Sequence, residues 1–256
     1  MTNALKRKWA AGEAALGAWL AMPSTVSAEL MARLGFDWLT IDLQHGLIDF
    51  ARMVEMLQAI GTTPTTTIVR VPLAESSWIG RVLDAGAQGV IAPLIDTADE
   101  ARAVVEACRY PPRGRRSYGP FRAAILAGGS YTPSADEEVV CLVMIETRAG
   151  LDNLEAILDV PGIDGVFVGP NDLSLALGLP PAADHDVPSF TDAIDRIVAG
   201  CRSRGLVAGC AGNAAVARKR LAQGFRFVEV SRDAAAMMRA AGEDLRGVRA
   251  LLASRE

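Results

Sequence analysis

The sequence lacks the residues on which several large classes of protein depend. Its four cysteines form no CxxC pair and show no zinc spacing, so neither a disulfide framework nor a zinc module is expected. No run of Lys or Arg exceeds three residues, and the formal net charge is -4, which argues against a nucleic-acid partner. No apolar run approaches the roughly 20 residues that cross a membrane. A small molecule is therefore the favoured partner.

The N-terminal segment has some features of a secretory signal peptide, with basic residues 6–8, apolar residues 14–22 and small residues 26–28. Cleavage there would remove residues 17–22, which have the composition of a first β-strand. We therefore expect the segment to be retained, in a cytoplasmic protein whose thiols stay reduced.

Short segments rich in Val, Ile and Leu alternate with amphipathic segments along the chain, which predicts a parallel sheet with helices between its strands. The eight expected strands cover residues 17–22, 37–44, 65–71, 89–95, 139–147, 164–170, 206–212 and 225–231. The expected helices cover residues 27–35, 50–61, 76–86, 97–109, 148–160, 190–205, 213–224 and 234–252.

Eight strands that are each followed by a helix predict a (β/α)8 (TIM) barrel, as one domain over residues 1–256. An open, doubly wound α/β sheet is the alternative, but it usually carries a Gly-rich phosphate loop after its first strand. The corresponding segment here is Pro23-Ser24-Thr25, and the chain contains no GxGxxG. Two long connections, residues 110–138 and 179–188, are expected to be functional or interfacial loops.

The active site of such a barrel lies at the carboxyl ends of the strands, so polar residues there are the candidates for chemistry. These residues are Asp42, Gln44, His45, Arg70, Glu146, Asn171 and Asp172. Glu146 shares its strand face with the three apolar residues that alternate before it, so its carboxylate should point into the barrel mouth, near Asp172. Two such carboxylates suit Mg2+ or Mn2+, which complete an octahedron with water and substrate oxygens. Alternatively, Asp172 caps a helix and Glu146 forms a salt bridge, and the pattern leaves both interpretations open.

His45 and Arg70 could supply the remaining chemistry. An imidazole at the barrel rim, beside Asp42, can take or give a proton near neutral pH. The other histidine, His185, lies in the Pro-rich loop and is expected to be solvated. A guanidinium at the end of the third strand could hold a carboxylate or a developing oxyanion, or could pair with Glu146 or Asp172.

The scarcity of lysine narrows the mechanism. Only Lys6, Lys8 and Lys219 are present, and none stands at the carboxyl end of an expected strand. A Schiff-base mechanism would therefore lack its amine nucleophile. Any aldol chemistry in this chain should depend on a metal ion.

Three segments carry a family resemblance: GFDWLTIDLQHG (35–46), RVPLAESSWIGRVLDAGAQGVIAPLIDTADEARAVVEACRYPP (70–112) and IETRAGLDNLEAILDVPGIDGVFVGPNDLSLALG (145–178). They resemble the HpcH/HpaI aldolases, the class II pyruvate aldolases typified by 4-hydroxy-2-oxoheptanedioate aldolase. The resemblance runs from about Gly17 to the C-terminus. It implies a (β/α)8 barrel, commonly hexameric with C-terminal helices exchanged between subunits, that uses Mg2+, Mn2+ or Co2+.

The resemblance also implies roles for individual residues. Glu146 and Asp172 would be the metal ligands, Arg70 would stabilise an oxyanion, and His45 would act as acid and base. The residues expected around the substrate are Arg70, Trp19, Gln44, Gly169, Pro170, Asn171 and Asp172. The family often has Glu at the position of Gln44 and Gln at the position of Met144, so substrate preference does not carry over.

The family pairs this histidine with an acidic residue that falls on Asp84. Asp84 lies near the end of the expected helix 76–86, which must finish at the bottom of the barrel, whereas His45 lies at the top. A pair formed across a subunit interface of a homo-oligomer, a trimer or hexamer, would reconcile these positions. Otherwise the orienting role passes to Asp42. The segment YPPRGRRSYGP (110–120) matches a family loop that shapes the pocket across such an interface.

We therefore expect a metal-dependent carbon–carbon lyase that joins pyruvate, or a close 2-oxo acid such as hydroxypyruvate, to an aldehyde and cleaves the product. An acyl-CoA lyase of the citrate-lyase β type should carry a basic nucleotide-binding surface. The one dense basic cluster is formed by Arg113, Arg115, Arg116 and Arg122, which we assign to an interface or to acidic substrates. A non-catalytic barrel that binds 2-oxo acids is disfavoured because His45, Arg70 and the carboxylates are all present.

Overall fold

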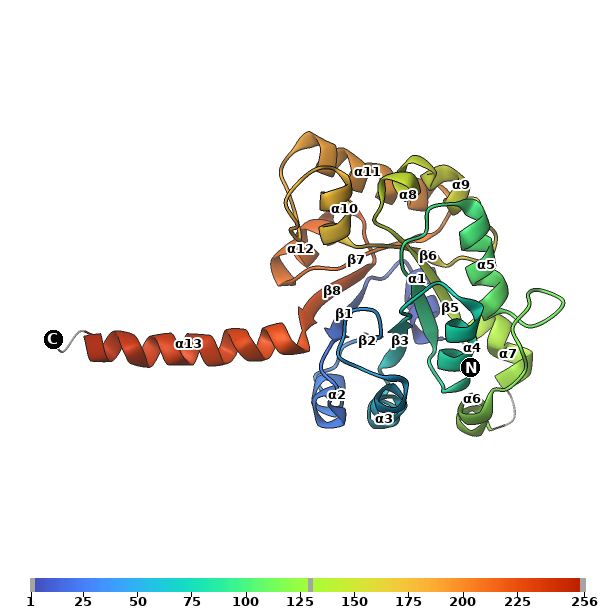
Figure 1. The fold of residues 1–256 in the computed structure, drawn as a ribbon, viewed down its shortest axis with the longest axis horizontal. Coiled ribbons are helices and arrows are strands. Elements are labelled where there is room, and N and C mark those ends of the chain that lie inside the picture. Colours follow the sequence, from blue (N-terminus) through green and yellow to red (C-terminus); the bar gives the residue numbers. More distant parts are fainter. Residues whose placement is uncertain (1–2, 129–130, 254–256) are drawn as a thin grey trace.

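The alternating apolar and amphipathic segments fold into a closed ring of eight parallel strands with helices around it (Figure 1). The computed structural model describes residues 3–128 and 131–253. The strands are β1 (Ala15–Leu20), β2 (Trp38–Asp42), β3 (Thr66–Arg70), β4 (Gly89–Ala92), β5 (Val140–Ile145), β6 (Gly165–Val168), β7 (Val207–Cys210) and β8 (Phe227–Arg232). Each pairs with its neighbours in sequence, and β8 closes the ring on β1. The predicted (β/α)8 barrel is confirmed.

The helices that follow the strands occupy the predicted segments. They are α2 (Thr25–Ala32), α3 (Phe50–Ile60), α4 (Ser76–Asp84), α5 (Ala98–Cys108), α8 (Arg148–Asp152), α9 (Leu154–Leu158), α11 (Pro188–Ser203), α12 (Ala214–Gln223) and α13 (Asp233–Ala253). Local chemistry fixes several of their ends. Thr97 and Glu100 form a capping box at the start of α5, and Gly224, with φ of 103°, ends α12.

Aromatic side chains fill the barrel interior. Trp38 stacks on Phe227 with ring centroids 4.0 Å apart, and Trp19 stacks on Phe167 at 5.4 Å. A helix that the sequence interpretation missed, α1 (Ala4–Ala10), buries Leu5 and Trp9 against this interior cluster. The interior is thus a packed core, and polar side chains gather above it at the carboxyl ends of the strands.

Besides α1, three segments depart from the predicted elements. The connection 110–138, expected to be a loop, contains α6 (Phe121–Ala127) and α7 (Tyr131–Glu138). The predicted helix 148–160 is divided into α8 and α9 at Asn153, whose side chain donates a hydrogen bond to the carbonyl of Asp96. The eighth strand extends one residue beyond its predicted end, to Arg232.

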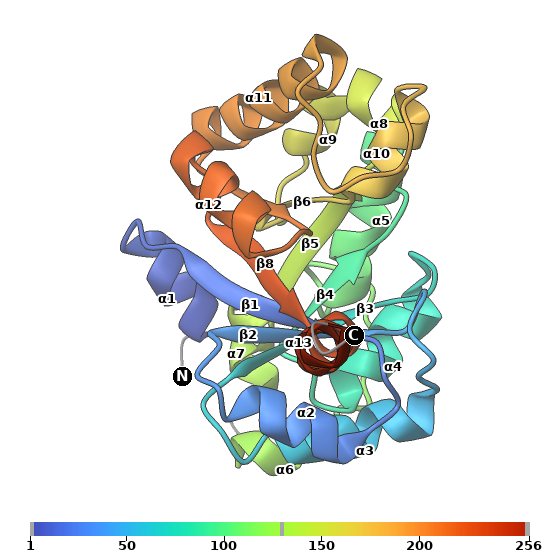
Figure 2. The ribbon, with the colours of Figure 1, turned by 90° about the vertical axis from the view of Figure 1, so that its left-hand side faces the viewer.

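The last helix, α13, leaves the barrel at the end of β8 and projects away from it (Figures 1 and 2). Asp233 anchors its start, because the buried carboxylate accepts hydrogen bonds from the backbone of Ala21 and Met22. Apolar side chains beyond that point are exposed, namely Met237, Met238, Leu245, Val248, Leu251 and Leu252. No described helix, α13 included, has the length and apolar character needed to cross a bilayer.

Candidate active site

Glu146 follows β5 at the carboxyl end of the barrel and is only 2% exposed. Its Oε1 accepts a hydrogen bond of 3.0 Å from the backbone of Leu94, while Oε2 has no partner among the described residues. The pKa of Glu146 is raised to about 7, chiefly by burial and further by the nearby charge of Asp172, although the Leu94 hydrogen bond and the charge of Arg70 oppose the rise. A buried carboxylate oxygen without a donor is the arrangement that a bound cation would satisfy.

The backbone of Gly169 approaches the Glu146 carboxylate closely. A Cβ atom on Gly169 would lie 2.0 Å from Oε2 of Glu146, so only glycine permits this approach. Gly169 and Pro170 lead from β6 into α10 (Pro170–Ala176), whose first turn carries Asn171 and Asp172. The structure therefore brings both predicted metal-ligand carboxylates to the same end of the barrel.

The donor set fits a hard divalent cation. No group of three or more His, Cys, Asp or Glu side chains suited to a metal occurs among the described residues. Two carboxylates are nevertheless the typical protein contribution to a Mg2+ site, where water and substrate supply the other oxygens. The unpartnered Oε2 of Glu146 supports this fit.

Arg70 pairs with Asp42 rather than with Glu146 or Asp172. Its Nε donates to Oδ1 at 2.8 Å and its Nη2 donates to Oδ2 at 2.6 Å. The pair forms because Asp42 and Arg70 are directly opposite each other on β2 and β3. Burial alone would raise the pKa of Asp42, but the hydrogen bonds and charge of Arg70, with the Trp19 indole, hold it below its usual value. Nη1 of Arg70 donates no hydrogen bond to a described residue.

Asp42 also organises the rim loop that follows β2. Its Oδ1 accepts hydrogen bonds from the backbone of Gln44 at 3.0 Å and of His45 at 3.3 Å, and its Oδ2 accepts one from Trp19 Nε1 at 3.1 Å. Trp19 is buried, and its indole N–H is used to hold the Asp42 carboxylate in place. The His45 side chain is exposed, and Asp42 holds its main chain rather than its imidazole. Gln44 Oε1 is buried without a partner.

Asp84 ends α4 and lies away from His45 within the chain. Its Oδ1 accepts a hydrogen bond of 2.7 Å from Nη2 of Arg116, and Nη1 of Arg116 donates to the hydroxyl of Tyr131. The segment before β4 is the bottom of the barrel, whereas His45 follows the top of β2. The separation predicted from topology is therefore present.

The basic cluster around Arg116 is engaged by the protein itself. Arg113 pairs with Glu137, and Arg115 lies 3.3 Å from Glu106. Arg122 donates to the carbonyl of Ala85. Because these arginines are paired within the chain, their cluster is not the free basic surface that a nucleotide-bearing substrate would require.

His185 is not the solvated loop residue that we expected. It is half-buried, with Nε2 lying 3.1 Å from Oγ of Ser174 and 2.9 Å from the carbonyl oxygen of Pro180. Ser174 belongs to α10, so the Pro-rich loop packs against the helix that carries Asp172. The proximity of the two segments in space could not be derived from their spacing in sequence.

Two charged residues at the end of β8 were missed. Glu229 is buried, accepts a hydrogen bond from the backbone of Gly212, and pairs with Arg232. Glu229 follows the inward Phe227 by two residues, the same signal that identified Glu146. Arg232 lacked any such signal, because its direction depends on an irregularity in the strand.

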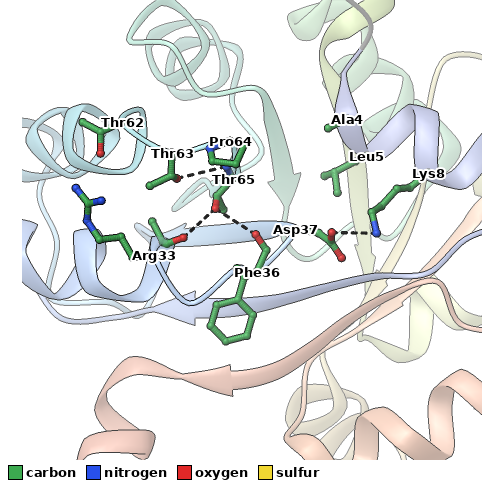
Figure 3. Close-up of a pocket in the computed structure, with 12 residues that line it drawn as sticks. Ala4, Leu5, Lys8, Arg33, Phe36, Asp37, Thr62, Thr63, Pro64 and Thr65 are labelled. Atoms are coloured by element: carbon green, nitrogen blue, oxygen red, sulfur yellow. Dashed lines mark hydrogen bonds and ion pairs between the residues drawn. The ribbon is translucent and has the colours of Figure 1, made fainter.

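A cavity of about 570 Å3 lies at the opposite end of the barrel (Figure 3). Its polar groups already have partners: Lys8 pairs with Asp37, Thr63 donates to the carbonyl of Ile60, and Thr65 donates to the carbonyl of Phe36. The cavity offers no unpartnered polar side chain for catalysis, which leaves the carboxyl end as the candidate site.

Comparison with known proteins agrees with this geometry. Residues 15–240 match the model of the family described as HpcH/HpaI aldolase/citrate lyase. A hydroxypyruvate/pyruvate aldolase of Rhizorhabdus wittichii is 42% identical, over 97% of this chain and 100% of that protein. A 2-keto-3-deoxy-L-rhamnonate aldolase of Klebsiella pneumoniae is 40% identical, over 91% of this chain and 88% of that protein. The crystal structure of an aldolase/citrate lyase family protein from Burkholderia cenocepacia superposes with a TM-score of 0.91 at 34% identity, covering 97% and 100% of the two chains.

Proposed function

Because the chain belongs to the HpcH/HpaI aldolase/citrate lyase family and resembles named aldolases over nearly its whole length, we propose that it is a carbon–carbon lyase acting on 2-oxo acids. The reaction is the reversible aldol addition of pyruvate, or of a close analogue such as hydroxypyruvate, to an aldehyde. The observation that carries this proposal is the buried Oε2 of Glu146, which faces Gly169 and lies near Asp172 without a donor.

Glu146 and Asp172 would hold a divalent cation, Mg2+, Mn2+ or Co2+. Such an ion, when bound, polarises the carboxylate and keto oxygens of the 2-oxo acid and thereby acidifies the neighbouring carbon. The backbone N–H groups of Asn171 and Asp172 would donate hydrogen bonds to the substrate carboxylate, and the absent side chain of Gly169 would let it approach.

Arg70 and His45 would act on the reacting atoms. The Asp42 carboxylate holds Nε and Nη2 of Arg70, so Nη1 is the donor that can stabilise negative charge on the keto oxygen. His45, on the rim loop that Asp42 fixes, would remove the proton of the 4-hydroxyl in cleavage and return it in addition.

We further propose a cytoplasmic homo-oligomer, a trimer or hexamer, in which α13 packs against another subunit. The projection of α13 and its exposed apolar side chains support exchange of this helix. The four cysteines are free, which is compatible with a reducing compartment.

The metal mechanism can be separated from a Schiff-base mechanism in one assay. Lys6 and Lys8 lie in α1, and Lys219 in α12 pairs with Asp184 and Asp186, so none of the three amines is placed for attack in the barrel mouth. We expect pyruvate aldolase activity to survive borohydride in the presence of pyruvate, to disappear with EDTA, and to return with Mg2+, Mn2+ or Co2+. Irreversible inactivation by borohydride, with pyruvate trapped on the protein, would overturn the proposal.

A further inference from the structure

The strand β8 changes its register where it reaches the barrel mouth. Gly17 of β1 is paired with Glu229, but Ala18 is paired with Ser231, so Val230 is passed over. Such a bulge re-aims the side chains that follow it. The bulge places Arg232 opposite Trp19, whereas regular pairing would have placed Ser231 there. The side chain of Trp19 belongs to the barrel interior.

Arg232 and Glu229 form an ion pair that repeats the geometry of Arg70 and Asp42. Nε of Arg232 donates to Oε1 of Glu229 at 3.1 Å, and Nη2 donates to Oε2 at 3.3 Å. Nη1 donates no hydrogen bond to a described residue. The Glu229 side chain is 0% exposed and that of Arg232 is 41% exposed, so the pair presents its cation to the solvent in the mouth.

The two guanidinium groups share one aromatic neighbour. The guanidinium carbon of Arg70 lies 5.0 Å from the Trp19 ring, and that of Arg232 lies 5.9 Å from it. Because both guanidinium groups lie against the same indole ring, the distance between them is at most the sum of these two distances. Each has a carboxylate on two of its nitrogens and offers the third to a ligand.

The position of Arg232 distinguishes it from the groups that would bind the 2-oxo acid. Glu146 and Asp172 follow β5 and β6, whereas Arg232 ends β8, on another side of the ring. The proposed reaction gives Arg232 no role at the keto acid. The acceptor aldehyde must reach the reacting carbon through the same mouth, and its distal end is the part of the substrate that remains to be held.

We propose that Arg232 binds a carboxylate on the acceptor aldehyde, so that this chain prefers acidic aldehydes. The inference rests on the proposed aldolase function and adds the acceptor class to it. Glu229 fixes the guanidinium in its fork geometry and leaves Nη1 to the substrate, an arrangement suited to charge-assisted recognition of a carboxylate.

The test compares two aldehydes that differ only at the distal end, 4-oxobutanoate and butanal. Each is condensed with pyruvate in the presence of Mg2+ or Mn2+ by the wild-type protein and by Arg232→Gln. We expect the wild type to prefer 4-oxobutanoate in kcat/KM. Arg232→Gln should lose about 10- to 100-fold in kcat/KM with 4-oxobutanoate, the usual effect of one charged hydrogen bond, and less than about 2-fold with butanal.

A second variant is needed as a control for misfolding, because Arg232→Gln leaves the buried Glu229 carboxylate without its cation. The double variant Glu229→Gln/Arg232→Gln removes both charges and should show the same selective loss. Equal losses with both aldehydes in both variants, or a preference for 4-oxobutanoate that survives them, would overturn the inference while leaving the aldolase function in place. A wild-type protein that condenses pyruvate with butanal but not with 4-oxobutanoate would overturn this inference alone, whereas one that condenses neither pyruvate nor hydroxypyruvate with either aldehyde would overturn the proposed function as well.

Discussion

Glu146 couples the metal site to the stability of the protein. Its carboxylate is buried, one oxygen has a single backbone donor, and the other has no partner among the described residues. A cation at Oε2 would stabilise the ionised form, and without one the folded protein favours the protonated form. Stability in the absence of metal should therefore depend on pH through this residue.

The direction of that dependence follows from the raised pKa. Glu146 has an ordinary pKa of 4.5, and burial raises it to about 7 in the folded protein. The folded state binds this proton more tightly than the unfolded chain, so the stabilisation is complete below about pH 4.5 and is lost as the pH rises through 7. In EDTA, the free energy of unfolding of the wild type should fall by about 3 kcal/mol relative to Glu146→Gln between pH 4.5 and 8. Urea unfolding of both proteins across this range measures the effect, and parallel pH profiles would contradict it.

Gly169 should be as necessary for the metal as the carboxylates are. In Gly169→Ala the new Cβ would lie 2.0 Å from Oε2 of Glu146, so the carboxylate must move away from the ion. We expect the affinity for Mn2+ to fall by about 10- to 100-fold, measured by calorimetry, with the far-UV circular dichroism unchanged. Gly80→Ala is the matched control, because no atom lies within 4 Å of its added Cβ, and this variant should bind Mn2+ normally. Equal affinities in the two variants would contradict the prediction that the metal site needs glycine at position 169.

The site residues differ in how far the sequence predicts them. Glu146 follows from regular alternation along a strand, and the same reasoning would have reached Glu229. Arg232 does not follow, because a bulge at Val230 reverses the face to which it belongs. The pairing of Arg70 with Asp42 depends on the register of β2 and β3, which alternation alone does not define.

At the scale of elements, the barrel could be predicted because buried strands and amphipathic helices have distinct periods. The strands were located to within a few residues, and apolar composition alone was enough to locate them, β1 and β8 included. The connections were less predictable. Whether 110–138 is a loop or contains α6 and α7 depends on contacts such as that of Arg122 with the carbonyl of Ala85, which join segments far apart in sequence.

The Pro-rich connection before α11 acts as a clamp on two helices. His185 contacts Ser174 of α10, and Asp184 accepts hydrogen bonds from Lys219 and Arg220 of α12. Burial alone would raise the pKa of Asp184, but these two cations lower it below its usual value. The clamp therefore joins the helix that carries Asp172 to the outer wall of the barrel.

Removing the clamp's charge should destabilise the protein. The Arg220 side chain is 1% exposed, so Asp184→Asn leaves a buried cation without its carboxylate, at an expected loss of about 3 kcal/mol in the free energy of unfolding. Asp186→Asn is the control, since that carboxylate also contacts Lys219 but is 95% exposed and should contribute less than about 1 kcal/mol. Chemical denaturation of the two variants compares them directly. Similar losses would mean that the clamp does not depend on the buried pair.

At the scale of the whole molecule, the described chain leaves two features without an internal partner. The apolar side chains of α13 project beyond the barrel, and the exposed imidazole of His45 meets no described acceptor. Asp84 is partly exposed, and Arg116 occupies only its Oδ1, so Oδ2 can accept a further hydrogen bond. A neighbouring subunit could supply what each feature lacks.

The last prediction is that Asp84 of one subunit orients His45 of another. Within one chain the two residues lie at opposite ends of the barrel, so a pair between them requires a second copy. His45→Ala and Asp84→Ala should each have low activity, and subunits dissociated, mixed and reassembled from both variants should be more active than either parent, because some interfaces regain both residues. A mixture of His45→Ala with Arg70→Ala is the control. Both residues belong to the site of one chain, so no arrangement of those subunits contains a complete site. Recovery in the first mixture alone would establish the pair in trans, whereas no recovery despite subunit exchange shown by mass spectrometry would leave Asp84 as the structural partner of Arg116.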